Sequence, residues 1–128
     1  MKSFIAILIL TIAVNLLCIY DIFYTKNVFK YMTNQSEAIY TSLNTTPITN
    51  KNLSAKIYSL DKYWTKRMDI LSISISRKDL QPISDYLQFL KSSVTNNDQE
   101  TAVTYSLLLY YNLQGLEEIT GVHLINVL

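Results

Sequence analysis

The sequence contains few residues that supply turns, cross-links or catalytic groups: two Gly, two Pro, one Cys and one His among 128 residues. A single Cys excludes an internal disulfide framework and a cysteine metal cluster. Two glycines, Gly115 and Gly121, cannot build a Gly-rich phosphate loop. So few turn-forming residues argue against a β-sandwich or barrel. The sequence therefore predicts an all-α protein with long helices.

Titratable side chains do not gather into a recognisable catalytic or metal-binding motif. His123 has no second His and no free Cys or acidic cluster beside it, which excludes a His-based triad and a zinc site. The one adjacent carboxylate pair is Glu117-Glu118, and neighbours on a helix point about 100° apart. We therefore expect no enzyme activity, no cofactor and no bound metal.

Charge is balanced overall but is sorted along the chain. The net charge of +1 provides no field that would attract nucleic acid. Residues 51–91 carry eight basic and four acidic side chains, whereas residues 92–128 carry four acidic side chains and no Lys or Arg. We expect these two parts to attract each other across a helix–helix contact. A basic surface for lipid headgroups is the alternative.

The N-terminal segment has the length and composition of a membrane anchor. Phe4 to Tyr20 is apolar apart from Thr11 and Asn15, and a spanning helix needs about 20 such residues. No Ala-x-Ala-like site follows the apolar run, and the residues before Cys18 lack the small side chain that lipoprotein processing needs. Residues 1–24 are therefore predicted to form an uncleaved transmembrane anchor.

Residues within this anchor suggest how it sits in the membrane. Tyr20 and Tyr24 suit the membrane–water interface. Asn15, near the middle of the span, is either a tolerated polar residue or a point of self-association. Because a three-residue N-terminal tail is easily retained, we expect the N-terminus in the cytoplasm and residues 25–128 outside it.

The anchor helix is predicted to continue into a membrane-proximal helix, so that residues 25–50 comprise this continuation and a loop. Apolar residues recur near helical spacing between Ile22 and Leu43. The loop covers residues 44–50, where Pro47 and small polar residues interrupt the pattern. We expect residues 51–128 to form a small antiparallel bundle of about three helices.

The first two bundle helices follow from regular spacing of apolar residues. One stripe has Asn50 as its N-cap and comprises Leu53, Ile57, Leu60, Trp64, Met68, Leu71 and Ile75. Residues 73–76 also fit the period of a strand, but an isolated strand has nothing to pair with, so the helix is extended to Ile75. A second stripe, capped by Asp79 with Pro82 in the first turn, comprises Leu80, Ile83, Leu87, Leu90 and Val94.

A further helix completes the bundle. It begins after Asn97 or Asp98 and ends at Gly121 as a C-cap. The apolar tail, residues 122–128, is expected to pack back on the bundle. Its core-facing residues are Ala102, Tyr105, Leu109, Leu113 and Leu116. A domain this small is marginally stable alone, so support from the helix at 22–43, from a partner or from a second copy is expected.

Aromatic residues supply the candidate interaction sites. Trp64 lies on an apolar stripe, so core packing is the better interpretation than an exposed stacking surface. Tyr110 and Tyr111 are adjacent and offer at most one ring to the core and one to a partner. With Asn15 in the anchor, they are the candidate interaction residues.

The order of these features resembles a known family. A short anchor precedes a helix with Asp61-Lys62-Tyr63-Trp64; a polar break with Asp79-Leu80 and then Asn96-Asn97-Asp98 follow, and the chain closes on Leu124-Ile125-Asn126-Val127-Leu128. This resembles the membrane proteins of Gram-positive, mostly clostridial bacteria grouped as domain of unknown function 4363 (DUF4363). Ser74-Ile75-Ser76 stands where an acidic-His pair is expected. The resemblance implies location and architecture, and no activity.

Two functions are consistent with this sequence. The leading hypothesis is a membrane-tethered interaction module at the cell envelope, whose bundle binds another envelope protein or itself through a helix groove. The alternative is an extracytoplasmic sensory domain that holds a small ligand between helices. Buried polar residues on the stripes at 53–75 or 80–94 would favour the alternative, and neither stripe contains any.

Overall fold

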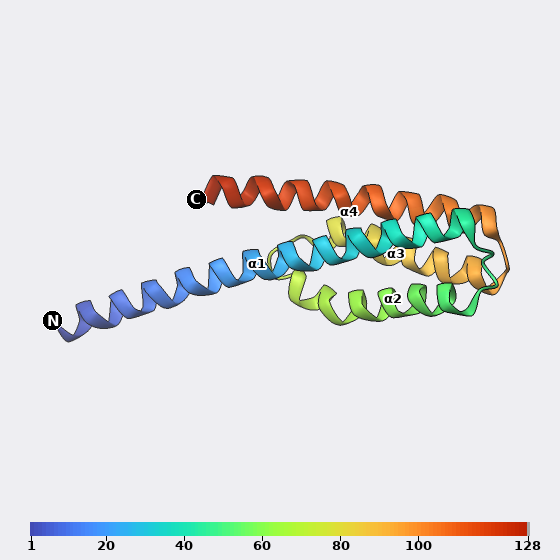
Figure 1. Ribbon diagram of the computed structural model, residues 1–128. Helices are drawn as coiled ribbons and strands as arrows, with labels where there is room; N and C mark the ends of the chain where they lie inside the picture. The colour runs from blue at the N-terminus through green and yellow to red at the C-terminus, as the bar shows by residue number, and fades with distance from the viewer. Residues whose placement is uncertain (128) are drawn as a thin grey trace.

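The computed structural model describes the backbone of residues 1–127 and the side chains of residues 1–120. It contains four helices, α1 (Lys2–Thr45), α2 (Lys51–Leu71), α3 (Arg77–Thr95) and α4 (Gln99–Val127), which pack into a bundle with no strand in the described backbone (Figure 1). The all-α prediction is confirmed.

α1 is a continuous helix whose two halves have different surroundings. No Gly or Pro interrupts its 44 residues, which corresponds to about 66 Å at 1.5 Å per residue. Residues 1–20 are all exposed, and this half projects beyond the bundle (Figure 1). The helix ends before Pro47 because a residue that precedes Pro avoids the helical region, and Thr46 is extended.

The second half of α1 belongs to the bundle. It packs against α4 and α2, so the bundle has four helices where the sequence predicted about three. The expected support from residues 22–43 is thus confirmed. Its buried residues recur at helical spacing: Thr25, Val28, Phe29, Met32, Thr33, Ser36, Ile39 and Leu43.

α2 begins where the sequence predicted but ends earlier. The Asn50 side chain accepts hydrogen bonds from the backbone N–H groups of Asn52 (2.9 Å) and Leu53 (3.2 Å), which confirms this N-cap. The predicted extension to Ile75 is wrong, because α2 ends at Leu71. Serines compete with the helix by bonding to nearby backbone, and Ser72 Oγ donates to the carbonyl of Asp69 at 2.6 Å.

α3 is capped by Ser76 and not by Asp79 as predicted. Ser76 Oγ accepts from the N–H of Lys78 at 3.2 Å, and Asp79 lies in the first turn. Because the helix begins at Arg77, Pro82 is its sixth residue and not part of the first turn. There, Pro82 removes one intrahelical hydrogen bond.

α4 begins at the predicted cap and continues past the predicted end. Asp98 accepts from the N–H of Thr101 at 3.1 Å and from its hydroxyl at 2.6 Å. The predicted C-cap at Gly121 is wrong: α4 continues to Val127, and no Gly in the described backbone has the positive φ of such a cap. The predicted packing of residues 122–128 lies outside the described side chains.

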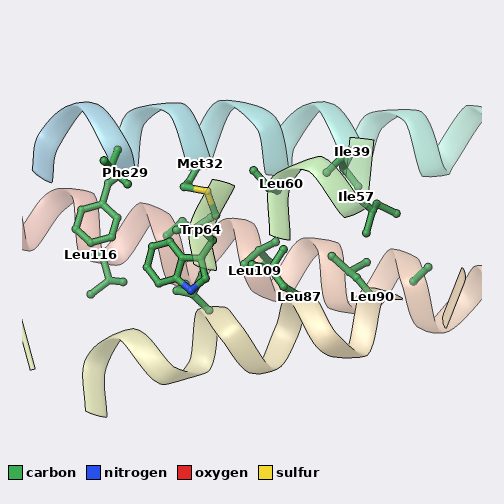
Figure 2. Packing of buried hydrophobic residues seen from close by; sticks show 14 of the residues in the cluster. Phe29, Met32, Ile39, Ile57, Leu60, Trp64, Leu87, Leu90, Leu109 and Leu116 are labelled. Atoms are coloured by element: carbon green, nitrogen blue, oxygen red, sulfur yellow. The ribbon is translucent and has the colours of Figure 1, made fainter. Parts of the chain in front are cut away.

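All four helices contribute to one core (Figure 2). Trp64 is 1% exposed at its centre, close to Phe29 of α1 with 6.3 Å between ring centroids. α4 begins at the end of the bundle away from the projecting half of α1 (Figure 1), and its first residue, Gln99, bonds to the end of α1 and to the loop that follows it. Its side chain accepts from the N–H of Ile48 (2.6 Å) and donates to the carbonyls of Leu43 (2.6 Å) and Thr46 (3.1 Å).

Candidate functional site

α4 has apolar side chains on the side that faces away from the core. Leu108, Tyr111 and Ile119 are 41%, 60% and 56% exposed. Residues three or four positions apart are neighbours on a helix surface. Gly115 lies four residues after Tyr111 and four residues before Ile119, so the three positions share one side of α4. A Cβ at Gly115 would meet nothing within 4 Å, so this position is open. α4 therefore presents an apolar stripe to the outside.

α3 widens this stripe with aromatic rings. Phe89 is 46% exposed and stacks on Tyr105 of α4, with 4.8 Å between ring centroids. The ring of Tyr86 is also close, with its centroid 6.2 Å from that of Tyr105. Tyr105 is one turn from Leu108, so the rings continue into the stripe. We call Phe89, Tyr105, Leu108, Tyr111 and Ile119 the α4 outer face.

The two tyrosines singled out from the sequence have different environments. Tyr111 is on the α4 outer face, whereas Tyr110 is half-buried, with 5.6 Å and 55° between the two rings. One ring therefore turns toward the bundle and the other away from it. Asn15 is exposed on the projecting half of α1 (Figure 1). The structure therefore places it apart from the tyrosines.

Sequence reasoning did not identify Phe89, Leu108 or Ile119 as surface residues. The signal was present in α4, which has more apolar residues than one core-facing stripe can bury. Tyr105 was assigned to the core and is only partly buried. Between residues 99 and 127 the charged side chains are Glu100, Glu117 and Glu118, so most of the surface of α4 is uncharged. A helix that is apolar on all sides needs a second apolar neighbour.

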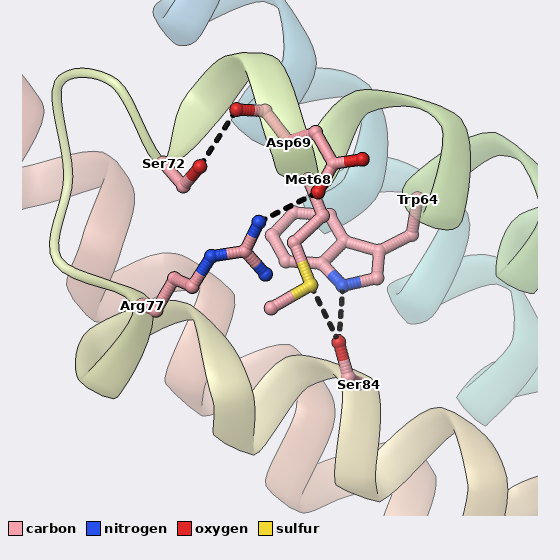
Figure 3. Close-up of polar contacts among 6 residues, drawn as sticks. All are labelled: Trp64, Met68, Asp69, Ser72, Arg77 and Ser84. Carbon is pink, nitrogen blue, oxygen red and sulfur yellow. Dashed lines mark hydrogen bonds and ion pairs between the residues drawn. The ribbon is translucent and has the colours of Figure 1, made fainter.

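Trp64 has a structural role. Its Nε1 donates to Ser84 Oγ at 2.8 Å, and that hydroxyl donates to Met68 Sδ at 3.1 Å (Figure 3). This arrangement joins α2 to α3 through one polar contact beside the core. The prediction that Trp64 is a core residue is confirmed.

Most buried hydroxyl groups bond to their own helix. Four of them donate to a backbone carbonyl three or four residues earlier: Thr33, Ser36, Ser93 and Ser106. Thr25 Oγ1 is buried with no protein partner and lines a hollow of about 90 Å³ with Asp21, Ser74 and Thr120. A second hollow, of about 390 Å³, opens at the other end between Ile48 and Val94.

The predicted helix–helix contact between the two oppositely charged parts of the chain forms between α3 and α4, but the described ion pairs lie elsewhere. Arg77 contacts Asp69 at 2.7 Å, and Lys91 contacts Asp61 at 2.9 Å. Both pairs lie within residues 51–91, and among the described side chains no ion pair joins that part to residues 92–120. The contact between α3 and α4 is apolar and aromatic instead.

Two titratable groups have shifted pKa values. Burial raises the pKa of Tyr63 above its ordinary value; the cation of Arg67 opposes this, and Tyr31 and Tyr24 add to it. The Arg67 guanidinium carbon lies 3.5 Å from the Tyr63 ring centre. Hydrogen bonds from the hydroxyl and N–H of Thr101 lower the pKa of Asp98. Both shifts follow from local packing and capping.

Comparison with known proteins adds no assignment to this geometry. No protein-family model matches the chain, and searches of curated proteins and of solved structures find no similar protein. The resemblance to DUF4363 stays a prediction. Among the described residues, no group of three or more His, Cys, Asp or Glu side chains could hold a metal ion. The arrangement is suited to binding through an apolar surface.

Proposed function

We propose that this chain is a membrane-tethered interaction module whose α4 outer face binds another helical protein of the cell envelope. The observation that supports this is the exposure of Leu108, Tyr111 and Ile119 on a helix whose opposite side already fills the core. Apolar patches rimmed by polar residues mark protein–protein contacts. A partner helix with its own apolar stripe would fit beside α4.

The tether is α1. Its apolar N-terminal half is long enough to span a membrane, and none of that stretch is buried in the bundle. The bundle begins directly after the apolar run, since Thr25 and Val28 are already buried. We place the N-terminus in the cytoplasm and the bundle outside it, anchored by a single span. Alkaline phosphatase fused after Leu128 would be active in this orientation, and an inactive fusion from a well-expressed chain would contradict it.

The proposed contact can be tested by removing its apolar groups. A double variant, Leu108→Ser with Tyr111→Ser, removes two exposed side chains and should keep the fold, because Leu109 and Leu113 still fill the core. We expect the tagged variant to lose the protein that co-purifies with the wild-type chain from native membranes. Tyr58→Ser on α2, where Tyr58 is 45% exposed, is the matched control. Equal recovery of the partner with the double variant would refute the assignment of the α4 outer face.

A further inference from the structure

The turn between α2 and α3 lies at the end of the bundle from which α1 projects (Figure 1). Within this turn, Ser74 donates a hydrogen bond to a carboxylate oxygen of Asp21. Asp21 is the first charged residue after the apolar run that ends at Tyr20. The contact therefore holds the turn, residues 72–76, beside the part of α1 that would leave the hydrocarbon core of a membrane.

The same turn exposes the aliphatic side chain of Ile73, whereas Ile75 packs against the core. Ile73 is 83% exposed, the highest value for a large apolar residue among the described side chains beyond the anchor. Ile70, one turn earlier in α2, is 48% exposed, and Phe23 of α1 is 53% exposed. Ile73 adjoins Ser74 in sequence, Ile70 is four residues before Ser74, and Phe23 is two residues after Asp21, so all three are close in sequence to the contact between Ser74 and Asp21. An aliphatic residue exposed beside this contact meets lipid rather than bulk water when α1 spans a bilayer.

We propose that the α2–α3 turn, residues 72–76, is a second membrane contact, with Ile73 inserted at the boundary between headgroups and acyl chains. The occupant is the same bilayer that α1 spans, so the inference rests on the membrane tether and not on the partner of the α4 outer face. Apolar residues on a surface segment enter this boundary while polar neighbours stay among the headgroups. With two contacts, the bundle stands at a fixed angle to the membrane and presents a fixed side to a partner.

Charge does not select the lipid. The described charged side chains near this end include Asp21, Asp69 and Asp79 together with Arg77 and Lys78, and Arg77 already pairs with Asp69. The mixture has no excess of basic groups for an anionic surface. The contact should therefore form on a zwitterionic phosphatidylcholine bilayer as well as on an anionic one.

Nitroxide accessibility measures this contact directly. The full-length chain with Cys18→Ala is placed in phosphatidylcholine nanodiscs, and single labels are attached through Ile73→Cys, Ile70→Cys, Leu10→Cys or Tyr58→Cys. Leu10 reports the span, and Tyr58 is an exposed residue of α2 nearer the other end of the bundle. Apolar oxygen concentrates in lipid and a charged nickel chelate is excluded from it. We expect the ratio of oxygen to nickel accessibility at Ile73 and Ile70 to be several-fold higher than at Tyr58.

The controls separate the outcomes. If Leu10 is accessible to oxygen and protected from nickel while Ile73 and Ile70 match Tyr58, the second contact is wrong and the tether stands. If Leu10 itself is accessible to nickel, α1 does not span the bilayer, and the tether fails together with this inference. A helical circular dichroism spectrum shows that each labelled chain is folded. Because Ile73 and Ile70 are both exposed, labels at either position leave the core intact.

Discussion

Leu108 and Leu109 are neighbours in sequence with opposite surroundings, since Leu109 is fully buried and Leu108 is 41% exposed. The sequence distinguishes them correctly because Leu109 continues the core stripe at helical spacing. The excess of apolar residues in α4 indicates an apolar outer surface, but the sequence could not assign Leu108 or Phe89 to it, because that assignment depends on how α3 and α4 are rotated against each other. The candidate site was thus predictable only at Tyr111.

Gly115 gives a prediction at this scale. It has no positive φ, and an added Cβ would meet nothing within 4 Å. Gly in a helix interior costs roughly 0.5–1 kcal/mol relative to Ala. We therefore expect Gly115→Ala to raise the free energy of unfolding by about this amount, measured by chemical denaturation in detergent micelles. A lower stability would mean that α4 lies closer to a neighbour at Gly115 than the structure shows.

Asp98 should make the stability of the fold depend on pH. Its pKa is lowered in the folded chain by bonds from Thr101, so the ionised form is the one that the fold stabilises. This contribution is fully present above the ordinary Asp value of 3.8 and is lost as the pH falls through the lower folded pKa. Asp98→Asn keeps a capping side chain without this titration. The difference in Tm between wild type and variant should shrink as the pH falls from 5 toward the folded pKa, and a constant difference would contradict this origin.

At the scale of helices, the sequence predicted the number and order of elements beyond the anchor and missed several ends. Apolar spacing continues from Leu71 to Ile75, so periodicity alone extended α2 through the turn. The actual end is set by serine side chains, which bond to the backbone and cap α3. Short polar residues decide helix ends by such local competition, which apolar spacing does not report. Asn50 was identified because it ends the loop at Pro47, where the apolar pattern is interrupted. Ser76 was missed because the apolar spacing continues to the residue before it.

Helix capping at α3 can be tested by comparing two alanine variants. Ser76→Ala removes the side chain that accepts from Lys78 N–H and should lower the unfolding free energy by about 1 kcal/mol. Asp79→Ala removes only a charge near the helix N-terminus, which is worth about 0.3–1 kcal/mol. Chemical denaturation at low and high salt distinguishes them, because only the Asp79 effect should weaken with salt. A larger, salt-independent loss at Asp79 would restore it as the cap.

For the whole molecule, one continuous helix joins the predicted membrane span to the bundle core. The sequence predicted that the anchor helix continues into a membrane-proximal helix, but it placed residues 25–50 outside the bundle, whereas Phe29, Met32 and Ile39 are buried as deeply as residues of α3. The sequence placed these residues on an imperfect apolar stripe, and periodicity alone does not show which helices cover such a stripe. A bundle that shares its helix with the anchor cannot rotate freely about a linker. The α4 outer face would therefore have a defined direction relative to a bilayer that α1 spans.

Site-specific photo-crosslinking in native membranes is the most direct test of the α4 outer face as the binding surface. A benzophenone amino acid replaces Tyr111 in one strain and the matched exposed residue Tyr58 in another. We predict that Tyr111 gives one dominant crosslinked protein, identified by mass spectrometry, and that Tyr58 does not. A dominant second copy of this chain would make the surface a self-association site. Crosslinks from Tyr58 that match those from Tyr111, or none from Tyr111, would contradict the claim.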